Sequence, residues 1–274
     1  MKTNANTYKI LVLSDLKKST TNLLKSSISL AQIINGDIDF FHVKKPTEIV
    51  GQESQLSAIR TINKLHTATT NEIEQIITPI SEAYNIPITY KHAFGNVKNE
   101  IGEYIKKTNP DIIVLGQRKS KPLSFIGDNI SDFVIAQHDG VIMIAADDKT
   151  LEPNSELSLG ALNGIEKSFN MDFAHSLIEH SQKPLKSFKI YKDSSASETQ
   201  KEIFGKKTIE YAFDQGSNSM KSLSNYLSKS DVNLLCFNRA TNGQDSLAKS
   251  EVKNAIDTLN VSLLITNGQN QSSI

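Results

Sequence analysis

The segment Tyr8-Lys-Ile-Leu-Val-Leu-Ser14, which Asp15 follows, decides the fold class of this chain. Its nearly unbroken aliphatic run is typical of a strand that is covered on both faces of a parallel sheet. Asn35-Gly36 closes a helix after this strand, with apolar residues at three- and four-residue spacing: Leu23, Leu24, Ile28, Ala31, Ile33 and Ile34. Because parallel strands need a crossover helix, this strand and helix predict an α/β fold.

Strands and helices continue to alternate through the first half of the chain. We expect further strands at 38–43, 86–92, 111–116 and 141–145, and helices at 54–84, 97–105 and 129–137. The early Pro87 indicates that the third strand lies at an edge of the sheet. Pro79 is expected to kink or divide the last turns of the long helix.

The second half repeats this pattern in a shorter form. A polar stretch at 147–156 predicts a linker, and therefore two domains at residues 1–150 and 151–274. Strands are expected at 157–162, 187–191, 208–213, 233–237 and 261–266, and helices at 169–180, 220–227 and 252–259. Only 16 residues separate Tyr191 from Thr208, whereas 42 separate Val43 from Ile86, so the second domain has no long helix.

One stretch of the first half has a clear counterpart in the second half. The segment Asn109-Pro-Asp-Ile-Ile-Val-Leu-Gly-Gln-Arg118 matches Ser230-Asp-Val-Asn-Leu-Leu-Cys-Phe-Asn-Arg239, and each precedes a helix and a final aliphatic strand. This match indicates an internal repeat of a whole domain. The strands at 141–145 and 261–266 could then pair with each other, which would make an internal pseudo-dimer and cover two sheet edges. A homodimer of the whole chain is a further expectation.

Composition excludes several classes of function. The 274 residues carry 30 basic and 30 acidic side chains, divided as 17 and 16 up to residue 150 and 13 and 14 after it. This balance argues against non-specific nucleic-acid binding and against binding to anionic membranes. The N-terminus has no apolar signal segment, and the longest apolar runs have strand length. Together with the single Cys236, which is expected to be a buried thiol, these features predict a cytoplasmic protein.

The candidate ligand site lies at the carboxyl ends of the strands of the first half. Asp15, Val43 and Gly116 each lie at the end of a predicted strand and are expected to converge on one crevice. Arg118, Lys119 and Lys121 follow in a loop that leads to a helix start near Gly127, where cations and free backbone N–H groups favour a phosphate. A solvated surface loop is the alternative interpretation.

At these residues the first half resembles the universal stress proteins. The similar segments are Ile10-Leu-Val-Leu-Ser-Asp15, Phe40-Phe-His-Val43, Gly95-Asn-Val97 and Asp111-Ile-Ile-Val-Leu-Gly116. The resemblance implies two flavodoxin-like domains in tandem, each with a doubly wound parallel sheet, and a role in the stress response through an adenine nucleotide such as ATP or AMP. It also implies a set of binding residues: Ser14, Asp15, Val43, Gly116, Arg118, Lys119, Gly127, Asp128 and Asn129.

The chain departs from the ATP motif of this family, which reads Gly, two residues, Gly, nine residues, then Gly with Ser or Thr. Gly116 matches the first position, but Lys119 replaces the second glycine, and seven residues instead of nine precede Gly127. Asp128 places a carboxylate where the family offers a hydroxyl, and this carboxylate would repel a phosphate because both groups are negative. These departures disfavour tight ATP binding and leave AMP, a dinucleotide or another phosphorylated ligand as alternatives. In the second half, Asn238 replaces the glycine at the end of the fourth strand, so that half is expected to have lost the site. The alternative is that Gly160, Asn163 and Gly164 shape a different small-ligand site.

Three functional hypotheses remain from the sequence. The first is a regulatory binding protein, the second a weak ATP hydrolase that uses Arg118 and Lys119, and the third a scaffold whose two sites are both vestigial. No nucleophile elbow or Walker-type phosphate loop is found, which favours a protein that is not an enzyme. No metal site is expected either, because His175 and His180 are five residues apart on a helix. His66, His92 and His138 stand alone in the sequence, and His42 is expected to be a hydrogen-bonded core residue.

Overall fold

The structure is a computed structural model and describes residues 7–45, 55–117, 130–164, 171–191, 199–216, 218–239 and 245–266. Strands and helices alternate in its first half, in this order: β1 (Tyr8–Ser14), α1 (Thr20–Ile34), β2 (Gly36–Lys44), α2 (Gln55–Tyr84), β3 (Ile88–Phe94), α3 (Val97–Thr108), β4 (Ile112–Gly116), α4 (Ile130–Gln137) and β5 (Val141–Ala145). The predicted α/β fold is confirmed.

The second half repeats the alternation with shorter helices and one added strand. Its elements are β6 (Leu159–Leu162), α6 (Ala174–His180), β7 (Leu185–Tyr191), β8 (Thr199–Ile203), β9 (Lys206–Asp214), α7 (Ser219–Lys229), β10 (Leu234–Asn238), α8 (Asp245–Thr258) and β11 (Ser262–Thr266). The shortened tandem copy that the sequence predicts is therefore present.

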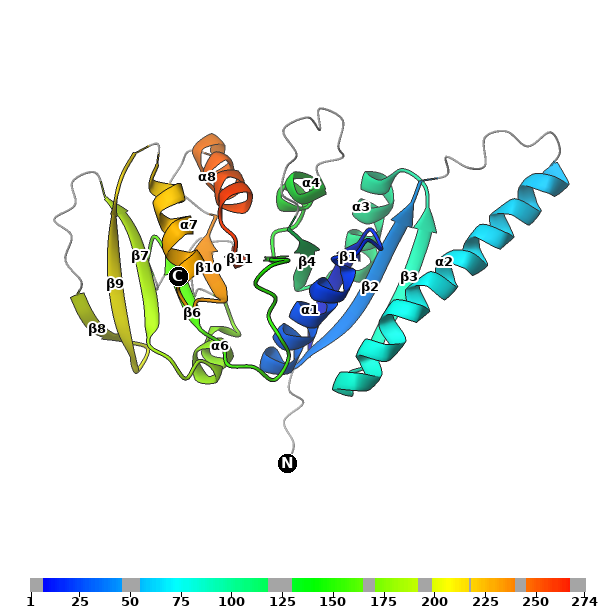
Figure 1. Ribbon diagram of the computed structural model, residues 1–274. Helices are drawn as coiled ribbons and strands as arrows, with labels where there is room; N and C mark the ends of the chain where they lie inside the picture. Colours follow the sequence, from blue (N-terminus) through cyan, green and yellow to red (C-terminus); the bar gives the residue numbers. More distant parts are fainter. Residues whose placement is uncertain are drawn as a thin grey trace, which may run out of the picture.

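The strands of the described residues form one sheet of eleven strands in the order β3-β2-β1-β4-β5-β11-β10-β6-β7-β9-β8 (Figure 1). The strands within each half are parallel, apart from β8, which runs antiparallel to β9. At the centre, β5 and β11 pair antiparallel, with Leu264 opposite Met143. This confirms the predicted pairing of the two final strands, which we call the seam. Counted outward from the seam, the two halves have equivalent strand orders: β5-β4-β1-β2-β3 on one side and β11-β10-β6-β7-β9 on the other.

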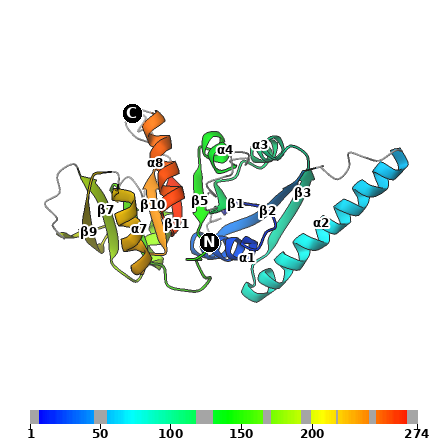
Figure 2. The same ribbon diagram turned by 45° about the horizontal axis from the view of Figure 1, so that its top comes forward.

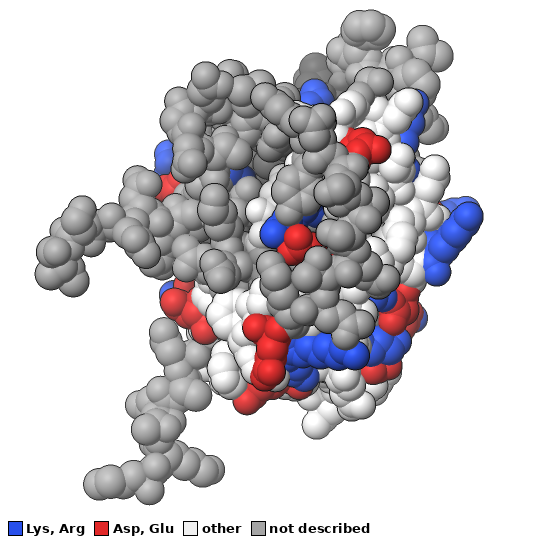
Figure 3. Space-filling model, turned by 90° about the vertical axis from the view of Figure 1, so that its left-hand side faces the viewer, with Lys and Arg blue, Asp and Glu red and all other residues white. Residues whose placement is uncertain are grey.

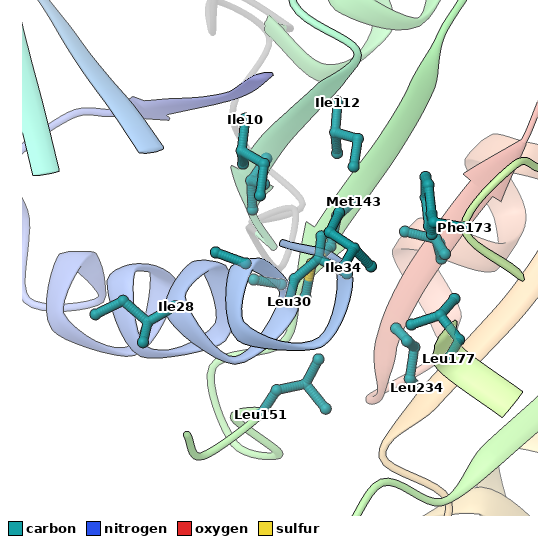
Figure 4. Packing of buried hydrophobic residues seen from close by; sticks show 14 of the residues in the cluster. Ile10, Ile28, Leu30, Ile34, Ile112, Met143, Leu151, Phe173, Leu177 and Leu234 are labelled. Carbon is teal, nitrogen blue, oxygen red and sulfur yellow. The ribbon is translucent and has the colours of Figure 1, made fainter. Parts of the chain in front are cut away.

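Helices cover both faces of the sheet, as a doubly wound fold requires. Buried side chains of α1, α2 and α6 pack on one face, and those of α3, α4, α7 and α8 pack on the other. On the first face the core is continuous across the seam, because Leu30 and Met143 of the first half lie in one cluster with Phe173, Leu177 and Leu234 of the second (Figure 4). The two halves therefore bury apolar surface together.

Residues 147–156, the predicted linker, contact both halves of the molecule. Leu151 is 2% exposed, and its backbone N–H donates a hydrogen bond of 3.1 Å to Ser26 Oγ of α1. Lys149 Nζ donates to the carbonyl oxygen of Ser230, at the end of α7, over 2.9 Å. This polar stretch packs against both halves because its one large aliphatic side chain reaches the common core.

Two local features differ from the expectations or refine them. The helix α2 runs undivided from Gln55 to Tyr84 with Pro79 inside it, and in Figure 2 it reaches well past the edge strand β3. The added strand β8 forms a hairpin with β9 through Phe204 and Gly205, whose φ angles are 53° and 68°. Positive φ at both residues matches the right-handed twist of a two-residue hairpin.

Two other expectations from the sequence, on β3 and on Cys236, are confirmed. The strand β3 lies at an edge of the sheet. Cys236 is completely buried, and burial raises the pKa of its thiol. No helix in the described ranges is long and apolar enough to cross a membrane.

Charges of both signs are interspersed on the surface of the second half. Figure 3 views the molecule from the β8 side and shows basic and acidic side chains next to each other. Ion pairs in this half join Lys189 to Glu210 over 2.8 Å and Lys183 to Asp231 over 3.1 Å. The two signs of charge, which are balanced in the sequence, are therefore also mixed in space among the described residues on the face shown.

Candidate functional site

The switch point of the sheet lies between β1 and β4 in the first half. From β1 the chain proceeds to β2 on one side, whereas β4 lies on its other side. Ligands of open parallel sheets bind outside the carboxyl ends of the strands at such a point. Four of the predicted binding residues lie at this edge: Ser14 ends β1 and Asp15 follows it, Val43 is near the end of β2, and Gly116 ends β4.

The turn after β1 holds the carboxylate of Asp15. Its Oδ1 accepts a hydrogen bond from the backbone N–H of Lys17 over 3.3 Å, and its Oδ2 lies 3.3 Å from Lys17 Nζ. Leu16 between them has a φ of 58°, a conformation that a leucine adopts rarely. The Asp15 side chain keeps 30% of its surface exposed. The turn therefore fixes an acceptor group at the carboxyl edge of the sheet without burying it.

A hydrogen-bond network beneath this turn connects β1, α1 and β2. Ser14 Oγ lies 2.9 Å from Thr20 Oγ1 and accepts a hydrogen bond from the backbone N–H of Leu16 over 3.1 Å. His42 Nδ1 lies 2.8 Å from the backbone oxygen of Ser14, and burial lowers the pKa of this imidazole. The prediction that His42 is a hydrogen-bonded core residue is confirmed. Because the imidazole contacts the carbonyl oxygen and not the hydroxyl, Ser14 and His42 do not form a catalytic pair.

Gly116 leaves open space at the end of β4. A Cβ atom built on it would have no heavy atom within 4 Å among the described residues. A ligand could therefore approach the backbone closely at this point. The other predicted residues of the phosphate loop, Arg118, Lys119, Lys121, Gly127, Asp128 and Asn129, lie outside the residues that the structure describes.

The matching edge of the second half has different contents. Gly116 pairs with Ala145 in the β4–β5 ladder, and Asn238 pairs with Thr266 in the β10–β11 ladder. Asn238 is thus the counterpart of Gly116, as predicted. By the same registers, Arg239 occupies the position in the second half that Gln117 occupies in the first. The sequence match had instead placed Arg239 opposite Arg118.

Arg239 and Gln117 both contact the half of the molecule to which they do not belong. The Arg239 guanidinium donates to carbonyl oxygens at the end of α4, those of Ile135 (3.1 Å), His138 (2.6 Å) and Gly140 (3.2 Å). Gln117 Nε2 donates to the carbonyl oxygens of Ile256 (2.8 Å) and Leu259 (2.5 Å) at the end of α8.

The sequence did not predict these helix-capping roles. A usable signal was present, because a polar residue directly follows the fourth strand of each half.

The first half of the chain is similar in sequence to a known protein family. Residues 7–139 match the model of the universal stress protein family. The first half of the chain belongs to the universal stress protein family. A comparison with curated protein sequences finds no match.

Several solved structures match almost the whole chain. A universal stress protein from Archaeoglobus fulgidus DSM 4304 has a TM-score of 0.67 at 14% identity, over 96% of this chain and 97% of that one. A functionally unknown protein from Pseudomonas aeruginosa PAO1 has a TM-score of 0.57 at 11% identity, over 97% and 94%. At these identities the likeness shows the fold alone, and it extends the universal-stress architecture over both halves.

Proposed function

We propose that this universal-stress-type protein binds an adenine nucleotide in its first half and acts as a ligand-responsive regulator of a stress response. The observation that supports this proposal is the meeting of Asp15, Val43 and the open backbone of Gly116 at the switch point of the sheet. AMP and ATP are the ligands that the family resemblance implies.

Each of the three residues offers a contact suited to one part of a nucleotide. The Asp15 carboxylate is an acceptor for the amino group of adenine or for a ribose hydroxyl. Val43 packs partly buried at the end of β2 and offers an apolar surface to the base. The phosphates can approach the backbone at Gly116, because glycine has no side chain and no heavy atom of the described residues lies within 4 Å of the position of a Cβ atom. The nucleotide would therefore lie across the ends of β1, β2 and β4.

We propose that the second half has no nucleotide site and serves as the internal partner of the first. Asn238 puts a side chain where Gly116 leaves space, and the Arg239 cation next to it is already bonded to three carbonyl oxygens. On this view residues 1–150 form the binding domain and residues 151–274 a shortened, degenerate copy, in a protein of the cytoplasm.

Binding rather than catalysis is the function that we assign. At the carboxyl edge the best-placed hydroxyl, Ser14 Oγ, is bonded to Thr20, and the nearby imidazole of His42 is turned to a carbonyl oxygen. Neither group is arranged as an activated nucleophile or as its base.

Calorimetric titration of the full chain with AMP, ADP and ATP tests the proposal. We expect binding of at least one nucleotide, and we expect Gly116→Val to abolish it, because the added side chain would occupy the space through which the phosphates approach the backbone. Gly216→Val is the matched control, since Gly216 also has open space around it and lies in the second half. If none of the three nucleotides binds at millimolar concentration, the nucleotide proposal is wrong and the scaffold hypothesis replaces it. Equal binding by the two valine variants would place the nucleotide elsewhere.

A further inference from the structure

Two histidines that stand 26 residues apart in the sequence meet at the outer edge of the first half. His66 lies on α2 and His92 on the edge strand β3, and His66 Nδ1 is 3.0 Å from His92 Nε2. The centroids of the two imidazole rings are 5.0 Å apart. The ring of Phe94 packs against both imidazoles, at 4.5 Å from His66 and 5.7 Å from His92. Sequence spacing gave no reason to connect these residues, because the contact depends on how α2 crosses β3.

The separation of the two nitrogens matches that of neighbouring ligands on one metal ion. With metal–nitrogen distances of about 2.05 Å, two ligands at 90° lie about 2.9 Å apart, and two ligands at the tetrahedral angle lie about 3.3 Å apart. The observed 3.0 Å lies between these two values, and it is also an ordinary hydrogen-bond distance between two imidazole nitrogens. A right angle between nitrogen ligands is typical of the tetragonal sites of Cu(II) and Ni(II), whereas Zn(II) prefers the tetrahedral angle.

The protonation and accessibility of the pair also suit a metal ion. Burial lowers the pKa of His92, and the nearby His66, His42 and Lys44 lower it further, so its imidazole is neutral at neutral pH. A neutral imidazole is the form that binds a metal. His66 is exposed and His92 is half-buried, which leaves room for an ion to enter and for water to occupy its other positions. Among the groups that lower the pKa of His92, Lys44 is a permanent cation, and its effect ranks after those of the two other histidines.

We propose that His66 and His92 form a two-imidazole site for a divalent ion of tetragonal preference, with Cu(II) bound more tightly than Ni(II) or Zn(II). The order of affinity follows from the general series for nitrogen ligands. Such an ion would join the long helix α2 to the edge strand β3. No group of three or more metal-binding side chains occurs within the described ranges, so the two imidazoles are the protein ligands and water completes the site.

Titration of the untagged full chain with Cu(II), Ni(II) and Zn(II) at pH 7.5 tests this site. Calorimetry should give one tight Cu(II) equivalent, and electron paramagnetic resonance should show coupling to two imidazole nitrogens. His66→Ala and His92→Ala should each weaken Cu(II) binding by about tenfold or more, since each removes one of two ligands. The matched control is the double variant His175→Ala, His180→Ala, which removes two exposed histidines of α6 and should bind Cu(II) like the unaltered chain.

Three results would overturn the proposal: an equal loss of Cu(II) affinity in the control, unchanged affinity in the His66 and His92 variants, or tighter binding of Zn(II) than of Cu(II). His66 is exposed on a helix surface, so His66→Ala is expected to fold, and circular dichroism verifies this. His66→Gln keeps a hydrogen-bonding side chain but offers a poorer ligand, so it should also lose Cu(II) if the imidazole is what binds. None of these measurements depends on the nucleotide proposal.

Discussion

Gln117 and Arg239 each cap a helix in the opposite half of the molecule, across the seam. Each directly follows the fourth strand of its own half, and each donates hydrogen bonds to the carboxyl end of the last helix in the other half. The last carbonyl groups of a helix have no partner within the helix and carry a partial negative charge. These two side chains satisfy them reciprocally, so the seam is held by side chains as well as by the β5–β11 ladder.

The Arg239 contact should contribute measurably to stability. Arg239→Ala leaves the carbonyl oxygens at the end of α4 without their charged donor, and we expect it to lower the free energy of unfolding by about 2 kcal/mol. Gln117→Ala removes neutral hydrogen bonds and should cost about 1 kcal/mol. Urea denaturation at neutral pH measures both values.

Arg239→Lys is the matched control for the geometry of this contact. It keeps the positive charge at a helix terminus but loses the planar fork that reaches three carbonyl oxygens. We expect it to recover part of the lost stability. An Arg239→Ala variant within about 0.5 kcal/mol of the unaltered chain, the range of an ordinary surface substitution, would show that the cap is unimportant.

The strands of the seam should be essential for folding. Ile142 and Leu264 are both completely buried, and lysine at either position would bury an unpaired charge. The double variant Ile142→Lys, Leu264→Lys is therefore expected to unfold the whole chain, as judged by circular dichroism. Ile142→Val, which only deletes a methyl group, should cost about 1 kcal/mol. A folded, monomeric double lysine variant would contradict the seam.

Substitution by alanine should distinguish a glycine with close neighbours from a glycine with open space around it. A Cβ atom on Gly160 in β6 would lie 2.9 Å from Phe188 and 3.0 Å from Leu235. Gly160→Ala should therefore cost about 1–3 kcal/mol through overpacking. Gly216→Ala meets open space and should stay within about 0.5 kcal/mol. Equal stabilities of the two variants in urea would mean that the core around β6 yields to a methyl group.

The buried histidines predict a loss of stability in mild acid. In the folded protein the pKa values of His42, His92 and His138 lie below their ordinary value of 6.5, chiefly because of burial. Below pH 6.5 the unfolded chain therefore binds more protons than the folded one, and the free energy of unfolding decreases as the pH falls from 7.5 toward 5.5. Above pH 7.5 this contribution is fully present.

Urea denaturation across this pH range tests the histidine effect. His42→Gln can still donate a hydrogen bond to the Ser14 carbonyl oxygen but does not titrate, so it should reduce the pH dependence. The exposed His175→Gln serves as its control and should leave the dependence unchanged. The role of His42 would be refuted by equal pH dependence in these two variants.

The aliphatic strands of this chain are predictable from sequence, because burial on both faces of a sheet selects continuous apolar runs. The pairing of β5 with β11 is predictable for the same reason, since two such strands would otherwise be exposed edges. The strand β8 is not predictable in this way. Its sequence, Thr199-Gln-Lys-Glu-Ile203, has no apolar run, and its position depends on the hairpin turn at Phe204 and Gly205.

The candidate site is predictable to the extent that strand ends define it. Ser14, Asp15, Val43 and Gly116 lie at the expected edge, because parallel strands bring their carboxyl ends together. The contact between His66 and His92 could not be predicted, because it depends on the path of α2 across β3. The capping by Arg239 was missed for a related reason: its acceptors belong to a helix more than 90 residues away in the sequence.

The packed connection at residues 147–156 has a consequence for how the two halves can change. In an assembly of two identical chains, every substitution appears on both sides of the interface at once. Here each side is encoded separately, and the covalent connection keeps the interface formed at any protein concentration. Asn238 can therefore differ from Gly116, and Arg239 from Gln117, without altering the other side, so the two halves can specialise separately.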